Sequence, residues 1–356
     1  MDNKVNIFID CCADIDDSLI INTLISLFIN YDNINIIGIS ISYGKSWFDV
    51  NPHKIQQILN AFQINKQIDI FKGVNHSLYS ENKLGSLSHY VSRLNYPSIT
   101  GDILKSKFEE LKNGKNVFVS LTNLTCFSTL IMQCPNLRLF IDKFICLAGA
   151  FNEDIDKEIN IMMDPNAANH VLHDPIMKNK VIMFPYSVTS KFCIEEHKFA
   201  NLKDSIPHYL LKSGEQKHPL FPTSDDILNK VIVHGLPALI CISEYIKEDS
   251  NAYDWGYKEH RLIFTTENPY KGKANILKVV ENEDSACKLL DIDQRGSAVV
   301  YDMNYDEAWK TFCHLLNEAD DTYTRISNNW YSKNIKLLSM LVLSLSLFLS
   351  FIYRVY

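Results

Sequence analysis

The chain has 356 residues, 46% of them hydrophobic, and carries a formal net charge of −7. This composition excludes a disordered chain, and the negative charge gives no electrostatic reason to expect nucleic-acid binding. Nine cysteines lie scattered without a C-x-x-C pair, and no charged-then-apolar leader precedes the first apolar run. This pattern favours a reducing, cytosolic setting for the main body of the chain.

Short apolar runs alternate with helical patterns, which predicts an α/β fold with a mainly parallel sheet flanked by helices and a Rossmann-type core. The expected strands are Val5–Ile9, Ile34–Ser42, Ile68–Phe71, Asn116–Leu121, Lys143–Leu147, Lys180–Phe184 and Ala298–Tyr301. The expected helices are Ser18–Phe28, Pro52–Phe62, Gly101–Leu111, Thr122–Met132, Pro165–His173 and Asp306–Leu316. Between Ser187 and Lys247 the pattern is helical and less regular, and we expect it to form a side wall of the site. Right-handed crossovers would bring the carboxyl ends of the strands to one edge of the sheet.

Four carboxylates crowd the end of the first expected strand, at Asp10, Asp14, Asp16 and Asp17. Open α/β sheets place their ligand crevice at this edge. Charge repulsion makes such a cluster costly unless a cation, a proton or a polyhydroxyl ligand occupies it. The alternative is a solvated acidic turn in which Asp16 or Asp17 stabilises the start of the next helix.

The stretch from Asp10 to Asp17, DCCADIDD, resembles the motif D-x-D-P-G-x-D-D that opens members of the nucleoside hydrolase family (inosine-uridine preferring type). Further segments resemble the motifs of that family in the same order: Gly38–Lys45, Ile70–Gly73, Val117–Asn123, Asn152 with Glu158–Ala168, and His234–Ala238. The resemblance covers about residues 5 to 316.

The resemblance implies hydrolysis of a ribonucleoside by water to free base and ribose, with Ca²⁺ holding the ribose diol and the attacking water. It assigns metal binding to Asp17 and the Thr122 carbonyl, and it places Asp10 behind these ligands without direct contact with the metal. His234 would protonate the leaving base. The ribose contacts implied are Asp16, Asn152, Glu158 and Asn160.

Three positions depart from the family pattern. Cys12 stands where the family has its general base and a metal carboxylate, and Gly235 stands where it has another carboxylate ligand. Lys45 replaces an asparagine, and its ammonium could occupy the acidic cluster in place of a metal. Thiolate is a poor ligand for Ca²⁺, so calcium binding should be weakened. Asp14 is the residue that could compensate for these losses, through a rearranged loop.

Three hypotheses follow from these residues. The first is a divergent family member that binds a ribonucleoside and in which hydrolysis is weakened or lost. The second is an active, calcium-dependent, membrane-tethered nucleosidase for purine or pyrimidine nucleosides. The third is a non-catalytic interaction protein. A zinc site made by Cys12, Asp17 and His234 fits by ligand type, but no sequence spacing supports it. Whether the chain is an enzyme, and whether it forms oligomers, stays open from the sequence.

The C-terminal tail forms a separate unit. Residues 337–353 carry no charge and are flanked by Lys336 and Arg354. At about 1.5 Å per residue this run spans roughly 26 Å, at the short end of the transmembrane range. We therefore expect a nucleoside hydrolase-like domain over residues 1–316, a linker over 317–333 and a transmembrane tail anchor over 334–356. The anchor would attach the chain to a membrane, with the main domain facing the cytosol.

Overall fold

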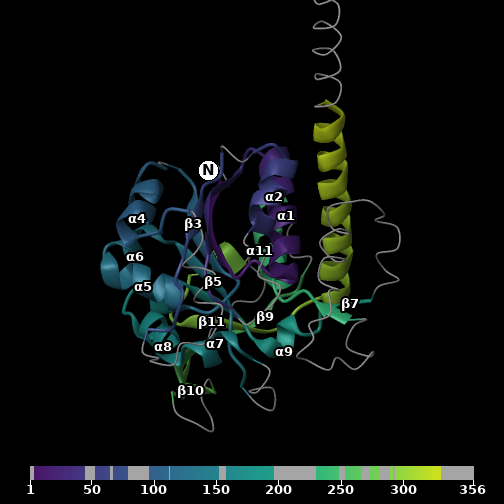
Figure 1. Ribbon diagram of the computed structural model, residues 1–356. Coiled ribbons are helices and arrows are strands. Elements are labelled where there is room, and N and C mark those ends of the chain that lie inside the picture. Colours follow the sequence, from purple (N-terminus) through teal and green to yellow (C-terminus); the bar gives the residue numbers. More distant parts are fainter. Residues whose placement is uncertain are drawn as a thin grey trace, which may run out of the picture.

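A nine-stranded sheet forms the centre of the molecule, and helices cover both of its faces (Figure 1). The computed structural model describes residues 4–44, 53–64, 67–78, 96–111, 113–151, 158–195, 230–247, 253–266, 273–280, 289–291 and 293–329. The strand order in the sheet is β10-β9-β11-β6-β5-β4-β1-β2-β3. The described part therefore has the α/β architecture with a mainly parallel sheet that the sequence predicts.

The bounds of the elements are close to those expected. The strands of the sheet are β1 (Val5–Cys11), β2 (Ile34–Ile41), β3 (Ile70–Lys72), β4 (Lys115–Ser120), β5 (Lys143–Leu147), β6 (Val181–Phe184), β9 (Gly256–Phe264), β10 (Ala274–Val280) and β11 (Ser297–Asp302). The helices are α1 (Ile15–Asn30), α2 (His53–Ala61), α4 (Gly101–Glu109), α5 (Thr125–Gln133), α6 (Leu137–Phe140), α7 (Asn160–Met163), α8 (Pro165–His173), α9 (Tyr186–Thr189), α11 (Leu236–Lys247) and a helix over residues 305–329. Two 3₁₀ turns, η2 (Met177–Asn179) and η4 (Leu289–Asp291), and a small hairpin of β7 (Cys193–Glu195) and β8 (Lys230–Ile232) complete the list.

Strand β1 is the middle of the parallel part of the sheet. It pairs in parallel with β2 and with β4, and Asp10 lies beside Ser40 on one side and Ser120 on the other. All seven of its residues are buried, as expected for a strand covered on both faces. The carboxyl ends of β1, β2, β4, β5 and β6 therefore meet at one edge, where the sequence placed the site.

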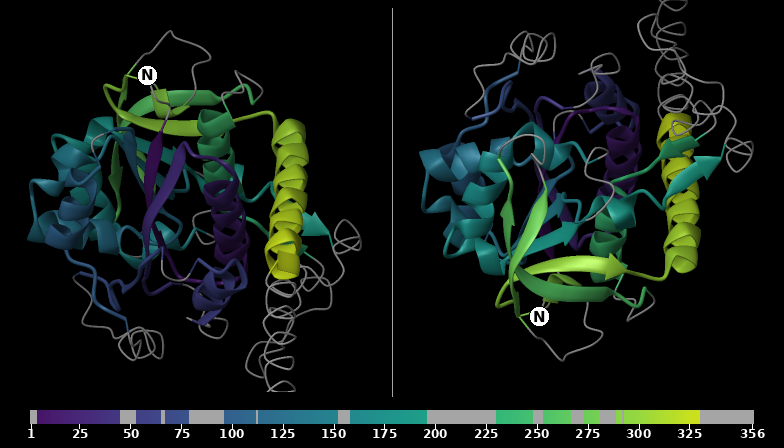
Figure 2. Two further views of the ribbon diagram at one scale, coloured as in Figure 1. Left: turned by 90° about the horizontal axis from the view of Figure 1, so that it is seen from above. Right: turned by 90° about the horizontal axis from the view of Figure 1, so that it is seen from below.

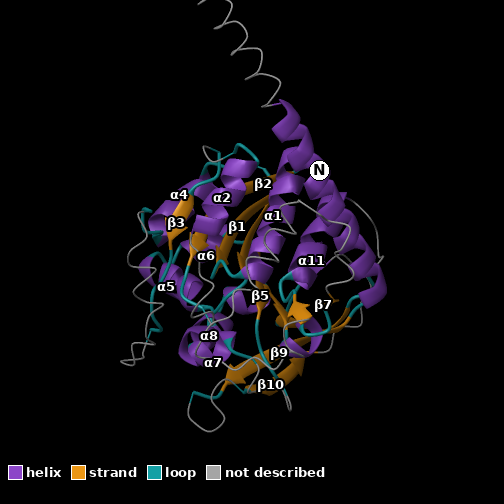
Figure 3. Ribbon diagram, turned by 45° about the vertical axis from the view of Figure 1, so that its right-hand side comes forward, coloured by secondary structure: helices purple, strands orange, loops and turns teal. Residues whose placement is uncertain are grey.

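Side chains alternate across β1 and divide the core into two layers. Ile7 and Ile9 pack with α1, α2 and α11, whereas Phe8 packs on the other face with residues of α4, α5 and α8. Figures 2 and 3 show these two helical layers on either side of the sheet. Each large apolar side chain buried in this way contributes about 1.5 to 3 kcal/mol relative to an exposed one, so the strand is strongly fixed in register.

Besides the β7–β8 hairpin, which lies where a helical pattern was expected, two features differ from the sequence-based expectation. Strands β9 and β10 form an antiparallel extension at the β11 edge, and the sequence reasoning did not find them. The stretch GYKEHRLIF of β9 alternates charged and apolar residues, so it lacks the continuous apolar run by which the central strands were recognised. The second difference is the helix of residues 305–329, which continues through 317–329, a segment expected to be linker.

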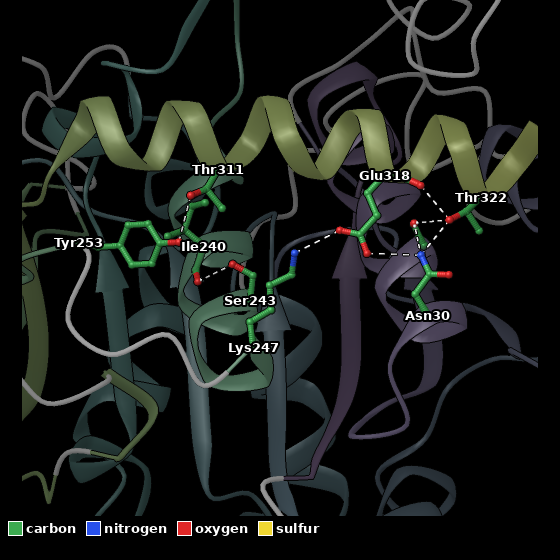
Figure 4. Close-up of polar contacts among 9 residues, drawn as sticks. Asn30, Ile240, Ser243, Lys247, Tyr253, Thr311, Glu318 and Thr322 are labelled. Atoms are coloured by element: carbon green, nitrogen blue, oxygen red, sulfur yellow. Dashed lines mark hydrogen bonds and ion pairs between the residues drawn. The ribbon is translucent and has the colours of Figure 1, made fainter.

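This C-terminal helix packs beside α1 and α11 through side-chain contacts (Figure 4). Asn30 of α1 donates to Thr322 Oγ1 at 2.8 Å and to Glu318 Oε1 at 3.4 Å. Lys247 at the end of α11 forms an ion pair with Glu318 at 3.1 Å. Buried Leu315 and Leu316 join the core on the same side, and these contacts explain why the helix continues past residue 316.

Within the described ranges, no helix combines the length and the apolar character that crossing a membrane requires. Residues 334–356, predicted as the tail anchor, lie outside those ranges.

Candidate active site

The turn between β1 and α1 forms the floor of the candidate site. Ala13 adopts a left-handed conformation with φ of 57°, which L-residues other than glycine seldom do. Asp14 then occupies the N-cap position of α1, but its side chain does not cap the helix. The carboxylate of Asp14 lies instead next to Cys12, with 3.2 Å between Asp14 Oδ2 and Cys12 Sγ. Asp14 therefore does not make the side-chain capping bond that an N-cap aspartate usually makes.

Asp17 lies in the first helical turn of α1, and its side chain contacts the loop between β1 and α1. Its Oδ2 accepts a hydrogen bond from the backbone N–H of Cys12 at 2.9 Å and lies 3.3 Å from Cys12 Sγ. Asp17 is only 2% exposed. Asp17 is therefore shielded from solvent, whereas Asp14 and Asp16 of the same segment are partly exposed. The positive end of the helix dipole favours carboxylates at this place.

One pocket brings most of the predicted site residues together. Its described lining comes from the ends of β1, β4, β5 and β6, from the start of α1, from residues 158–160 at the start of α7, from α9 and from the turn before α11. The lining residues are Cys12, Asp14, Asp16, Asp17, Leu121, Leu147, Ala148, Glu158, Ile159, Asn160, Phe184, Tyr186, Thr189 and His234. Carboxylates and a histidine thus face the same small space, as hydrolysis of a glycosidic bond requires.

The acidic side of the pocket is electrostatically strained. Burial and the neighbouring carboxylates raise the pKa of Asp14 and of Asp17 well above the usual value. Burial and the same carboxylates also raise the pKa of the Cys12 thiol, so Cys12 is a neutral S–H donor to either aspartate. No lysine or arginine is among the described residues that line the pocket. A proton or a cation must therefore compensate these charges.

The donors in this cluster fit a divalent cation, but they do not fit Ca²⁺. One ligand atom each from Cys12, Asp14 and Asp17 lie within 4.8 Å of one another, and Asp14 Oδ1 is buried without a hydrogen-bond partner among the described residues. The carbonyl of Thr122, which the family resemblance implies as a metal ligand, accepts a hydrogen bond from Ser120 Oγ at 3.1 Å. Ca²⁺ takes six to eight oxygen ligands, and here one of the three clustered donors is sulfur.

The opposite side of the pocket carries the predicted ribose contacts and the predicted acid. Glu158 is 5% exposed, and both of its oxygens accept from the Ile161 N–H, at 3.1 and 3.2 Å. Burial raises the pKa of Glu158 to about 7. Asn160 Nδ2 donates to the Leu147 carbonyl at 2.8 Å, which holds its side chain at the pocket wall.

His234 lies two residues before α11, in the side wall where the sequence placed it. Its Nδ1 is 3.0 Å from Thr189 Oγ1, and its ring centroid is 5.6 Å from that of Tyr186. Thr189 and Tyr186 belong to the short helix α9 that follows β6. The sequence reasoning missed both residues, and the available signal was their position just after the carboxyl end of a strand.

Two other expected site residues, Asp10 and Gly235, are not among the described residues that line the pocket. Asp10 is fully buried behind it, and its Oδ1 accepts from Ser40 at 2.5 Å and from Ser42 at 2.7 Å. Gly235 is buried against α1, where an added Cβ would lie 2.7 Å from Ile20 Cγ1. Asn152 and Lys45 fall outside the described residues.

Comparisons with known proteins all indicate nucleoside hydrolases. Residues 7–254 match the sequence profile of the inosine-uridine preferring nucleoside hydrolase family. The chain is 25% identical over 355 residues to the uridine nucleosidase of Saccharomyces cerevisiae, an alignment that covers 90% of this chain and 98% of the relative. Its fold is similar to that of an inosine-guanosine nucleoside hydrolase, with a TM-score of 0.63 at 14% identity, covering 89% of this chain and 99% of the other. A purine-preferring ribonucleoside hydrolase from Gardnerella vaginalis matches with the same TM-score, identity and coverage.

Proposed function

Because this chain belongs to the inosine-uridine preferring nucleoside hydrolase family, we propose that its pocket binds a ribonucleoside and hydrolyses the N-glycosidic bond far more slowly than an intact family site. The pocket supports binding through Asp16, Glu158 and Asn160, which the family resemblance assigns to the ribose. The environment of Cys12 is the observation that supports a slow rate of hydrolysis.

The proposed reaction needs one base and one acid. A water molecule attacks C1′ of the ribose, the bond from C1′ to the base nitrogen breaks, and the water loses a proton. Asp14 takes that proton, since the carboxylate lines the pocket and Oδ1 has no hydrogen-bond partner among the described residues. His234 gives a proton to the departing base, and Thr189 at 3.0 Å orients its ring.

Cys12 explains why this chemistry should be slow. Its thiol is neutral and donates toward Asp14 and Asp17, so it cannot take a proton from water as a carboxylate at the same place would. Asp14 is offset from that position by two residues along the turn, and misplacement of a catalytic group by about 1 Å can reduce a rate about 100-fold. A non-catalytic nucleoside-binding protein is the second candidate, favoured by the same neutral thiol.

Release of free base from inosine and uridine distinguishes these candidates. We expect slow release by the wild-type chain, loss of that release in Asp14→Asn, and a faster rate in Cys12→Asp. Asp321→Asn, a matched change on the exposed side of the C-terminal helix, should leave the rate unchanged. No release by any variant, together with calorimetric binding of the nucleoside, would establish the non-catalytic candidate. Rapid release by the wild type would contradict the proposed slow rate.

We also propose that residues 337–353 anchor the chain in a membrane with the main domain in the cytosol, because that run carries no charge and has basic flanks. Carbonate extraction of membranes tests this. Recovery of the full-length chain in the soluble fraction would refute the anchor.

A further inference from the structure

The cluster of Cys12, Asp14 and Asp17 presents three potential ligand atoms in one small volume. Cys12 Sγ lies 3.2 Å from Asp14 Oδ2 and 3.3 Å from Asp17 Oδ2. All three ligand atoms lie within 4.8 Å of one another, so a single ion could contact them together. The backbone N–H of Cys12 holds Asp17 in place at 2.9 Å, which fixes one ligand before any ion arrives.

The chemistry of these donors differs from that of a calcium site. Two carboxylates and one sulfur suit a borderline cation that accepts both kinds of ligand, whereas Ca²⁺ prefers an all-oxygen shell. Three protein ligands facing a pocket also leave a position for water or substrate, as catalytic zinc sites do. Asp14 Oδ1, the second oxygen of the same carboxylate, is buried without a hydrogen bond among the described residues, and an ion at this place would supply the partner.

We infer that the cluster of Cys12, Asp14 and Asp17 binds a divalent cation of the Zn²⁺ and Co²⁺ class in preference to Ca²⁺. The metal replaces the thiol proton of Cys12, and that proton passes to the solvent. The inference goes beyond the proposed function, which names no cation, and the place of the ion rests on the geometry of the cluster. Its test contains no nucleoside, so failure of metal binding and failure of hydrolysis are observed separately.

Cobalt reports directly on a sulfur ligand. The full-length chain is purified in mild detergent, freed of metal with a chelator and titrated with Co²⁺ alone. We expect a sulfur-to-cobalt charge-transfer absorption in the near ultraviolet at one equivalent of metal. Equimolar Zn²⁺ should abolish the absorption, whereas about a 100-fold excess of Ca²⁺ should leave most of it.

Two serine variants identify the ligand. Cys12→Ser replaces the thiol with a hydroxyl of similar size, so the absorption should disappear and the affinity for Co²⁺ should fall by about tenfold or more. Cys134→Ser, a matched change at the end of α5 and away from the pocket lining, should retain both. An absorption that persists in Cys12→Ser would place the metal on another cysteine and overturn the inference.

The wild-type competition decides the question even where Cys12→Ser does not fold. Displacement of Co²⁺ by Ca²⁺ at comparable concentrations would show an oxygen-dominated site and overturn the preference. Absence of any Co²⁺ binding to the folded wild type would overturn the site itself. Retention of Co²⁺ against Ca²⁺, together with its loss in Asp14→Asn, would support the inference.

Discussion

The packing of Gly235 against Ile20 leads to a quantitative prediction about stability. A Cβ at position 235 would lie 2.7 Å from Ile20 Cγ1, whereas ordinary contacts begin near 3.4 Å. Ile20 is 1% exposed and Gly235 is buried, so neither the Ile20 side chain nor a Cβ added at position 235 can move into solvent. Overpacking of this kind costs about 1 to 3 kcal/mol, which is the destabilisation that we expect for Gly235→Ala.

A double-mutant cycle isolates this contact. Ile20→Ala removes the opposing Cγ1 and should cost about 2 to 5 kcal/mol by itself through the cavity that it leaves. In that background Gly235→Ala should cost nothing or restore stability, which gives a coupling energy of about 1 to 3 kcal/mol. Urea unfolding of the four proteins measures the free energy of unfolding of each. Strict additivity would show that the clash with Ile20 is not what keeps residue 235 small.

The same contact affects any attempt to rebuild an all-oxygen metal site. Gly235→Asp adds a carboxylate as well as a Cβ, and a buried charge without a partner adds a further penalty of several kcal/mol. We therefore expect Cys12→Asp with Gly235→Asp to raise nucleoside hydrolysis only when Ile20→Ala is also present. The double variant alone should be poorly folded, which circular dichroism would show.

Three further predictions concern other positions. Ala13 has φ of 57°, so Ala13→Gly should change stability by less than about 1 kcal/mol, whereas Ala13→Val should destabilise by more than about 2 kcal/mol in thermal unfolding. The pKa of Glu158 is raised to about 7, so its charged, hydrogen-bond-accepting form is lost below that pH. Calorimetry should show nucleoside binding about tenfold weaker at pH 6 than at pH 8, and Glu158→Gln should remove this dependence. Burial lowers the pKa of Lys143 to about 8 in the folded state, so the unfolded chain binds more protons between pH 8 and 10. The stability of the wild type relative to Lys143→Met should rise by about 1.5 kcal/mol from pH 8 to 9.5, and a flat or falling difference would contradict this assignment.

The sequence predicts the parallel part of the fold well because its strands are buried on both faces. Continuous apolar runs such as Val5–Ile9 can form little else next to helical patterns, and the observed β1 extends that run to Cys11. Motif order also brought Asp17, Glu158 and His234 to one pocket, since each follows a strand or precedes a helix at the same edge. These placements depend on local pattern and on the handedness of crossovers, both of which can be inferred from one chain.

The features that the sequence did not reveal depend on contacts between distant segments. The orientation of Asp14 follows from the left-handed turn at Ala13, and neither an alanine nor an aspartate in the sequence predicts such a turn. Thr189 reaches His234 across 45 positions of the chain, and no motif links them. The loss of a carboxylate at Gly235 is visible in the sequence, but the side chain of Ile20 in α1 that fills the space there is visible only in three dimensions.

The helix over residues 305–329 determines how a mechanical load at the C-terminal end would enter the domain. At about 1.5 Å per residue this helix is roughly 37 Å long, and its contacts with the domain are spread along it. Asn30 contacts Thr322 and receives a hydrogen bond from Arg325 at 2.7 Å, while Tyr253 meets Thr311 at 3.1 Å. A pull along the helix axis would therefore be resisted in shear by α1 and the loop at Tyr253 before it reached β11. The load would thus enter α1 at its C-terminal end, one helix length away from Asp16 and Asp17 in the pocket.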